Sequence, residues 1–132
     1  MTGKFVPSSE AEREHLDWGV LTWLSRPANT GANQLVVIEA EVKPGFGHDF
    51  HKHPDQEEVI YVVDGQIEQW LDKESRMLQK GDSIFIGADV VHASFNVSDK
   101  PAKTLAILGP SMGEGGYEVV EVVDQEPWKS LR

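Results

Sequence analysis

Short apolar segments recur along this chain, and clusters of glycine, proline, aspartate and asparagine separate them. These segments are rich in β-branched and aromatic residues, and almost none has the period of an amphipathic helix. The pattern therefore predicts ten or so short β-strands. We expect them at residues 16–24, 35–42, 58–63, 66–71, 76–79, 83–86, 91–97, 103–108 and 117–123, with a further strand around residues 51–53.

Three details of this pattern make separate predictions. The alternation in residues 16–24 shifts phase near Gly19, which indicates an irregularity within that strand. The dipeptide Asp64-Gly65 suits a tight turn, and it predicts a hairpin that pairs residues 66–71 with the strand before them. The polar residues 10–15 are expected to form one helical turn or to stay irregular.

Many short strands at nearly regular spacing are typical of an all-β protein in which two sheets pack together. We predict a jelly-roll barrel, that is, a double-stranded β-helix. The length of 132 residues suits one compact domain and is too short for two ordinary ones. We assign residues 16–132 to this single domain and residues 1–15 to a polar leader.

The composition excludes several classes of protein. The net charge is -10, which is the opposite of the charge expected of a nucleic-acid-binding protein. The sequence has no cysteine, so it forms neither disulfides nor thiolate metal sites. It also has no apolar run long enough to span a membrane and no signal-peptide pattern at its start, and we therefore expect a cytoplasmic protein.

The chemistry of this chain is concentrated in residues 45–65. His51 and His53 are two residues apart, so on a strand both imidazoles point to the same face. The Pro54-Asp55-Gln56 segment can turn the chain back, which would return the carboxylate of Glu58 to the two histidines. His92, in a later strand-like segment, is the candidate for a fourth ligand.

These residues fit two motifs of the cupin superfamily, which the sequence resembles. The first motif, G-x5-H-x-H-x3-4-E-x6-G, is matched by Gly45, His51, His53, Glu58 and Gly65. The second motif, G-x5-P-x-G-x2-H-x3-N, is matched by Gly81, His92 and Asn96. Gly87 replaces its usual proline and Asp89 its usual glycine, two changes that a turn before the histidine tolerates.

The resemblance implies a metal site made of His51, His53, Glu58 and His92. Either Glu57 or Glu58 fits the permitted spacing from His53, but only Glu58 has six residues between itself and Gly65. Three imidazoles and one carboxylate suit a divalent transition metal, namely Fe, Mn, Ni or Zn, with Cu as a further option. Four protein ligands would leave two positions open on a six-coordinate ion, so the site has room for a substrate.

The functional expectation follows from this ligand set. We predict an enzyme that acts on a small organic molecule, most simply a dioxygenase-type oxidoreductase. A metal-assisted isomerase or lyase of a sugar or uronate is the first alternative, with His48 at the rim as a candidate proton carrier. A non-catalytic small-molecule-binding cupin is the second alternative. The resemblance also implies a homodimer, and the tryptophans of both flanks, Trp18, Trp23 and Trp128, are candidates for its interface. The equal alternative for Trp128 is that it fixes the C-terminal tail to its own barrel.

Overall fold

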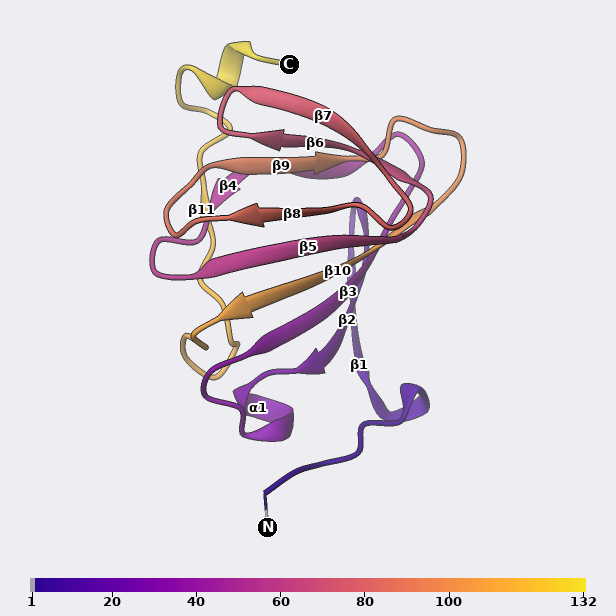
Figure 1. Ribbon diagram of the computed structural model, residues 1–132, viewed down its shortest axis with the longest axis vertical. Coiled ribbons are helices and arrows are strands. Elements are labelled where there is room, and N and C mark those ends of the chain that lie inside the picture. Colours follow the sequence, from indigo (N-terminus) through magenta and orange to yellow (C-terminus); the bar gives the residue numbers. More distant parts are fainter. Residues whose placement is uncertain (1) are drawn as a thin grey trace.

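The computed structural model describes residues 2–132 (Figure 1). In this part of the chain, eleven strands carry the fold, and the only helices are the four-residue α1 (Pro27–Thr30) and the 3-10 turns η1 (Ser8–Glu10) and η2 (Trp128–Ser130). None of these helices is long or apolar enough to cross a membrane. The strands are β1 (Glu12–Leu16), β2 (Gly19–Ser25), β3 (Val36–Val42), β4 (Gly47–Lys52), β5 (Glu57–Asp64), β6 (Gln66–Leu71), β7 (Glu74–Gln79), β8 (Ser83–Ile86), β9 (His92–Phe95), β10 (Ala102–Gly109) and β11 (Val120–Glu121).

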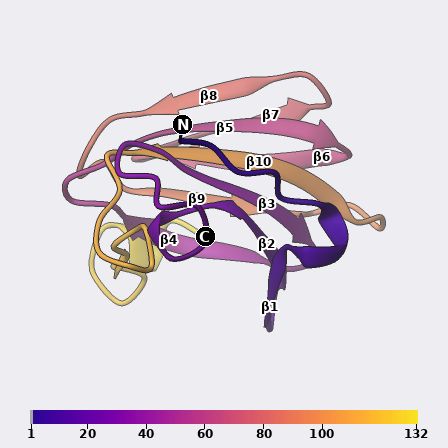
Figure 2. The same ribbon diagram turned by 90° about the horizontal axis from the view of Figure 1, so that it is seen from below.

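The strands form two antiparallel sheets. The six-stranded sheet has the order β1-β2-β3-β10-β5-β8, and the five-stranded sheet has the order β11-β4-β9-β6-β7. Figure 2 shows the molecule from below, with the C-terminal segment beside β4. This arrangement confirms the predicted all-β jelly roll.

Strand alternation places the core between the two sheets. Ile60 and Val62 of β5 are buried, as their shared parity with Glu58 predicts, while Tyr61 between them is exposed. The largest core cluster consists of side chains from β2, β3 and β10, namely Leu21, Trp23, Val36, Ile38, Ala40 and Leu108. Burial of these side chains supplies the main driving force for closing the sheets.

The predicted hairpin between β5 and β6 is wrong. β5 pairs with β10 and β8, whereas β6 pairs with β7 and β9 in the other sheet. Gly65 has φ +77°, as expected, but the turn here carries the chain from one sheet to the other. A side chain at Gly65 would also meet the backbone of Pro101 and Ala102 at 3.0 Å, so both conformation and space favour glycine.

The first motif is likewise divided between the sheets. β4, which contains His51, lies in the five-stranded sheet, and β5, which begins at Glu57, lies in the six-stranded sheet. The sequence suggested that the chain returns beside β4, and this expectation is wrong. The turn from Pro54 to Gln56 carries the chain from one sheet to the other, so Glu58 approaches the histidines from the opposite layer.

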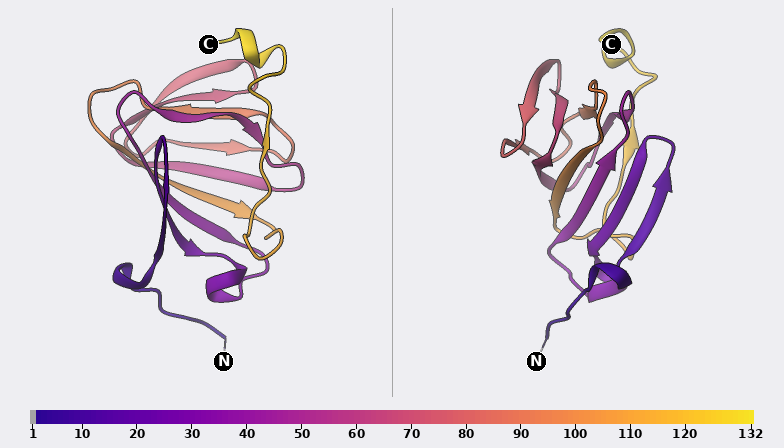
Figure 3. Two further views of the ribbon diagram at one scale, coloured as in Figure 1. Left: turned by 180° about the vertical axis from the view of Figure 1, so that it is seen from behind. Right: turned by 90° about the vertical axis from the view of Figure 1, so that its right-hand side faces the viewer.

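The N-terminal prediction needs a correction as well. Residues 12–16 form β1, which pairs antiparallel with β2 from Glu12↔Trp23 to Leu16↔Gly19. The irregularity expected near Gly19 is the turn of this hairpin, at Asp17 and Trp18. The hairpin lies at one edge of the six-stranded sheet (Figure 3). A polar strand is hard to recognise because an edge strand with one exposed face needs few apolar residues.

The tryptophans assigned to an interface lie against the protein's own core. Trp23 is 2% exposed, and Trp18 and Trp128 are half-buried. Trp128 packs against the cluster of Phe50 and Phe95, so the C-terminal tail is fixed to its own sheet. These residues therefore give the predicted homodimer no support, and the dimer stays a prediction. At this end of the chain the strand expected at 117–123 is shorter, because only residues 120–121 pair with β4.

Candidate metal centre

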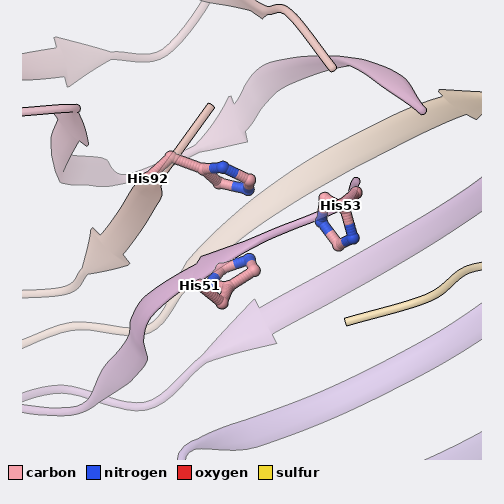
Figure 4. A group of neighbouring side chains, drawn as sticks. All are labelled: His51, His53 and His92. Atoms are coloured by element: carbon pink, nitrogen blue, oxygen red, sulfur yellow. The ribbon is translucent and has the colours of Figure 1, made fainter. Parts of the chain in front are cut away.

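The four residues predicted as ligands come together between the two sheets. The imidazoles of His51, His53 and His92 point toward one another (Figure 4), and their candidate ligand nitrogens all lie within 4.8 Å of one another. Glu58 Oε1 lies 2.9 Å from His92 Nε2 and 3.4 Å from His53 Nε2. All four side chains are buried, with exposed fractions of 1–6%. Glu57, the alternative carboxylate, is exposed on the outer side of β5.

Backbone carbonyls orient each of the three imidazoles. His51 Nδ1 lies 2.6 Å from the carbonyl oxygen of Asp49, and His92 Nδ1 lies 3.0 Å from that of Val90. The third, His53 Nδ1, lies 2.7 Å from the carbonyl oxygen of Glu118. Because a carbonyl only accepts, each Nδ1–H must donate, and each neutral ring then directs a free Nε2 lone pair inward. Metal-binding histidines are commonly oriented in this way.

Two atoms at the centre of the cluster indicate a cation. Within residues 2–132, Glu58 Oε1 and His92 Nε2 are buried and have no hydrogen-bond partner of acceptable geometry, although they are 2.9 Å apart. Buried polar atoms are normally satisfied, since leaving one unpaired costs about 1–3 kcal/mol. A shared positive ion would satisfy an imidazole lone pair and a carboxylate oxygen together. The residues therefore fit a divalent metal.

The ionised state of the Glu58 carboxylate also fits a bound divalent metal. Burial lowers the pKa of His51 well below 6.5, and the nearby His48 and His92 lower it further. Burial also lowers the pKa of His53, but the carboxylate of Glu58 outweighs it and leaves this pKa above 6.5. For Glu58, burial raises the pKa, yet His53 and His92 outweigh it and hold the value at about 2. The carboxylate is thus ionised at neutral pH.

The turn before His92 explains the departure from the second motif. Asp89 has φ +66°, a left-handed conformation in which the motif has glycine. Aspartate is one of the few other residues that enter this region at modest cost. Its backbone N–H donates to the carbonyl oxygen of His53 at 3.0 Å, so the turn is tied directly to the first motif. The substitution therefore keeps His92 in place.

A cavity of about 70 Å³ is lined by three of the four clustered side chains, those of His51, His53 and Glu58. This volume is well above the roughly 10–15 Å³ that one water molecule needs, and it suits the head group of a small ligand. Its floor is aliphatic and includes Leu21, Ile38 and Ile60. A groove of about 370 Å³ continues outward between the N-terminal hairpin and β4, and it shares Trp18, His48 and Tyr117 with the cavity. These three rings therefore form the mouth.

Comparison with known proteins decides the family. The cupin domain family matches residues 38–108, which is more than half of the chain and includes all four clustered side chains. This chain belongs to the cupin family. The match covers strands of both sheets, so the two-layer core and the histidine cluster belong to one family unit.

The sequence and structural relatives of this cupin carry names that refer to different activities. It is 33% identical over 110 residues to "Polyketide synthase CurC" of Streptomyces cyaneus, a match that covers 83% of this chain and 71% of that protein. It is 28% identical over 81 residues to quercetin 2,3-dioxygenase of Bacillus subtilis, covering 61% of this chain but only 24% of the dioxygenase. The structure of KdgF from Halomonas sp. shares the fold, with a TM-score of 0.76 and 18% identity over 86% of this chain and 99% of KdgF.

Two residues of this cupin's cavity were missed by the sequence reasoning. Tyr117 was placed in an expected strand, and Trp18 was assigned to an interface, yet both line the mouth. Burial, followed by the charges of Glu14 and Glu58, raises the pKa of Tyr117 to about 12, so its hydroxyl stays protonated. No sequence signal could have placed Tyr117 here, because it follows a glycine-rich connection of irregular path.

His48 lies at the rim, as the sequence reasoning allowed. Its ring stacks on His51 with centroids 3.6 Å apart and on Trp18 with centroids 5.1 Å apart. Its Nε2 lies 3.2 Å from Glu121 Oε1. Asn96, in contrast, is a structural residue: its amide donates to the carbonyl oxygens of Val42 and Lys100. His15 is exposed on β1.

Proposed function

We propose that this cupin is a metal-dependent enzyme that oxidises a small, metal-chelating organic molecule. His51, His53, His92 and Glu58 would hold a divalent transition metal, with Fe, Mn, Ni or Zn as the candidates and Cu as a further option. The observation that carries the proposal is the convergence of buried imidazole nitrogens on a carboxylate oxygen that has no hydrogen-bond partner among residues 2–132. A bound ion would supply Lewis-acid and redox chemistry there.

The chain's own residues prepare the site for such a substrate. The backbone carbonyls of Asp49, Val90 and Glu118 fix the imidazoles, so little reorganisation is needed on binding. The aliphatic floor excludes water from the reacting end of the molecule. The Tyr117 hydroxyl, protonated at neutral pH, is available at the mouth as a hydrogen-bond donor to a substrate oxygen.

Two features support oxidation as the reaction type. Apart from the candidate ligands, the described cavity wall has no paired acid and base, so the metal rather than a protein acid–base pair would organise the chemistry. The name of one relative points the same way, since it is a quercetin 2,3-dioxygenase. Enols with a neighbouring carbonyl, and vicinal diols, carry two adjacent oxygens, and these would occupy the two positions that the protein leaves open.

One observation favours a second candidate, a metal-assisted isomerase or lyase. The pair of His48 Nε2 and Glu121 Oε1, 3.2 Å apart at the mouth, has the composition of a proton-transferring group. A sugar or uronate that enters through the mouth would meet this pair next to the metal. A non-catalytic binding protein is less well supported, because the candidate ligand set is complete.

Oxygen consumption separates these functions. The protein loaded with Fe²⁺, Mn²⁺ or Ni²⁺ should consume oxygen with one or more members of a panel of enols, diols and uronates. The metal-free protein and a His92→Ala variant serve as controls, and both should be inactive. Turnover at the same rate without oxygen would overturn the proposed oxidation in favour of the isomerase or lyase. Binding without turnover would favour the non-catalytic protein.

A further inference from the structure

The charges around the mouth restrict the class of substrate. Within residues 2–132, neither the cavity nor the groove is lined by a lysine or an arginine. Three carboxylates, those of Glu14, Asp49 and Glu121, line the groove instead, and all three residues are exposed. A substrate that carried a carboxylate on the part of the molecule left in the groove would therefore find no cationic partner there.

The cavity is too small for a whole larger substrate, so part of the molecule must lie in the groove that the three carboxylates line. The cavity of about 70 Å³ takes a chelating head group, and the rest of a larger molecule must lie in the groove of about 370 Å³. The passage between them is bordered by Trp18, His48 and Tyr117, so the body of the substrate crosses aromatic rings before it reaches the carboxylates. Aromatic side chains favour contact with flat, weakly polar groups.

We propose that the enzyme selects an uncharged, planar oxygen chelator and discriminates against molecules whose body carries a carboxylate. This inference rests on the proposed function, since it assumes that the substrate's head group reaches a metal at the four clustered side chains. It goes further by naming the charge class of the substrate. It disfavours uronates, and it favours neutral enols and phenols.

The groove carboxylates can be neutralised without loss of their hydrogen bonds. Glu14 Oε1 accepts from Trp23 Nε1 at 3.1 Å, and Asp49 Oδ1 accepts from the backbone N–H of Phe50 at 2.8 Å. Glu121 Oε1 accepts from His48 Nε2 at 3.2 Å. The amide oxygen of glutamine or asparagine can accept the same bonds. The variant Glu14→Gln/Asp49→Asn/Glu121→Gln therefore changes the charge and keeps the framework.

Kojic acid and comenic acid are the matched probes. Both present the same hydroxypyranone chelating group, and they differ at a remote ring carbon, which carries a hydroxymethyl group in kojic acid and a carboxylate in comenic acid. Their dissociation constants from the metal-loaded protein give a ratio, which is normalised to the same ratio for the free metal ion. Metal content is measured on the same samples.

We expect the wild-type protein to prefer kojic acid by about tenfold, the effect of two or three charges acting across partly screened distances. The triple variant should lose most of this preference. Glu74→Gln, on the far edge strand β7, is the control and should keep it. A metal-loaded wild type that binds neither probe, that shows no preference, or whose preference survives in the triple variant would overturn this inference alone. Failure of the wild type to take up metal would overturn the proposed function and, with it, this inference.

Discussion

His53 Nδ1 lies 2.7 Å from the carbonyl oxygen of Glu118, a residue 65 positions later in the chain. Glu118 is held in turn by Gln56, whose Oε1 accepts from the Glu118 backbone N–H at 3.1 Å. The Gln56 amide also donates to the carbonyl oxygens of Pro110 and Gly116, at 2.7 and 2.9 Å. One buried glutamine thus fixes the glycine-rich connection that orients a candidate metal ligand and carries Tyr117.

Replacing Gln56 by alanine should therefore have two effects. The buried side chain would lose its three hydrogen bonds to the backbone, two of which leave the Glu118 N–H and the Pro110 carbonyl without this partner, and this should lower the free energy of unfolding by about 2–4 kcal/mol. The Glu118 carbonyl would no longer be held against His53, and metal affinity should fall about tenfold, as for other changes behind metal-binding histidines. Denaturant unfolding and metal titration measure the two effects. Gln125→Ala, at an exposed position, is the control; a Gln56→Ala protein as stable as this control would refute the first effect.

Removing a histidine of the cluster should remove the metal. The purified protein should carry about one transition-metal ion per chain. His53→Ala and His92→Ala should each lose most of it, because each loses a ligand that water replaces poorly. His15→Ala, at an exposed position on β1, should keep full occupancy. Elemental analysis checks these values, and full metal content in both cluster variants would rule out the assigned site.

The two adjacent glutamates should differ sharply. Glu58→Gln should weaken metal binding at least tenfold, since it removes the carboxylate whose Oε1 lies 2.9 Å from His92 Nε2 and 3.4 Å from His53 Nε2. Glu57→Gln, one residue away on the exposed side of β5, should bind metal like the wild type. Competition with a chelator of known affinity measures both constants. If Glu57→Gln alone were impaired, the carboxylate ligand would be the other residue.

Metal affinity should fall on acidification, beginning above pH 6.5. The pKa of His53 is raised above 6.5 by Glu58, so a proton competes with the metal at a higher pH than at an ordinary histidine. His51, whose pKa is lowered, stays neutral and does not compete in this range. Above the raised pKa the affinity should be nearly constant, and below it we expect about a tenfold loss per pH unit. Chelator competition from pH 8 to pH 5 tests this, and a flat profile would contradict it.

In the metal-free protein, acidification has the opposite effect at His53: it stabilises the fold instead of weakening metal binding. A raised folded pKa means that protonated His53 stabilises the fold below pH 6.5, and this contribution is lost as the pH rises through the folded pKa. Glu58, with a pKa near 2 against 4.5 for an ordinary glutamate, contributes stability above pH 4.5 that is lost as the pH falls toward 2. Unfolding of metal-free Glu58→Gln should therefore lack this acid-side decrease.

The mass of the protein in solution tests the predicted homodimer. Light scattering at micromolar concentration should give twice the mass of the chain if the prediction from the cupin resemblance holds. Since Trp18, Trp23 and Trp128 pack against the protein's own core, replacing the half-buried Trp128 should affect stability more than association. A monomer mass would refute the dimer.

The candidate site was predictable because its information is local. His51 and His53 share a parity, Glu58 is fixed by its spacing to Gly65, and His92 lies at a set distance from Gly81. Alternation also placed Ile60 and Val62 in the core. The parity follows from the period of a strand. The spacings to Gly65 and Gly81 are those of the two cupin motifs that the sequence resembles.

The sequence by itself determined the all-β class, most strand positions and the four residues that meet in the centre, because alternation and motif spacing act over a few residues. Only the tertiary structure decided that β5 and β6 belong to different sheets, that Trp18 and Tyr117 border the mouth, and that Gln56 ties the glycine-rich connection to His53. Strand pairing joins segments far apart in the chain, and a turn such as Asp64-Gly65 suits a hairpin and a crossing between sheets equally well. The long-range packing of both sheets makes that choice, so short sequence patterns do not contain it.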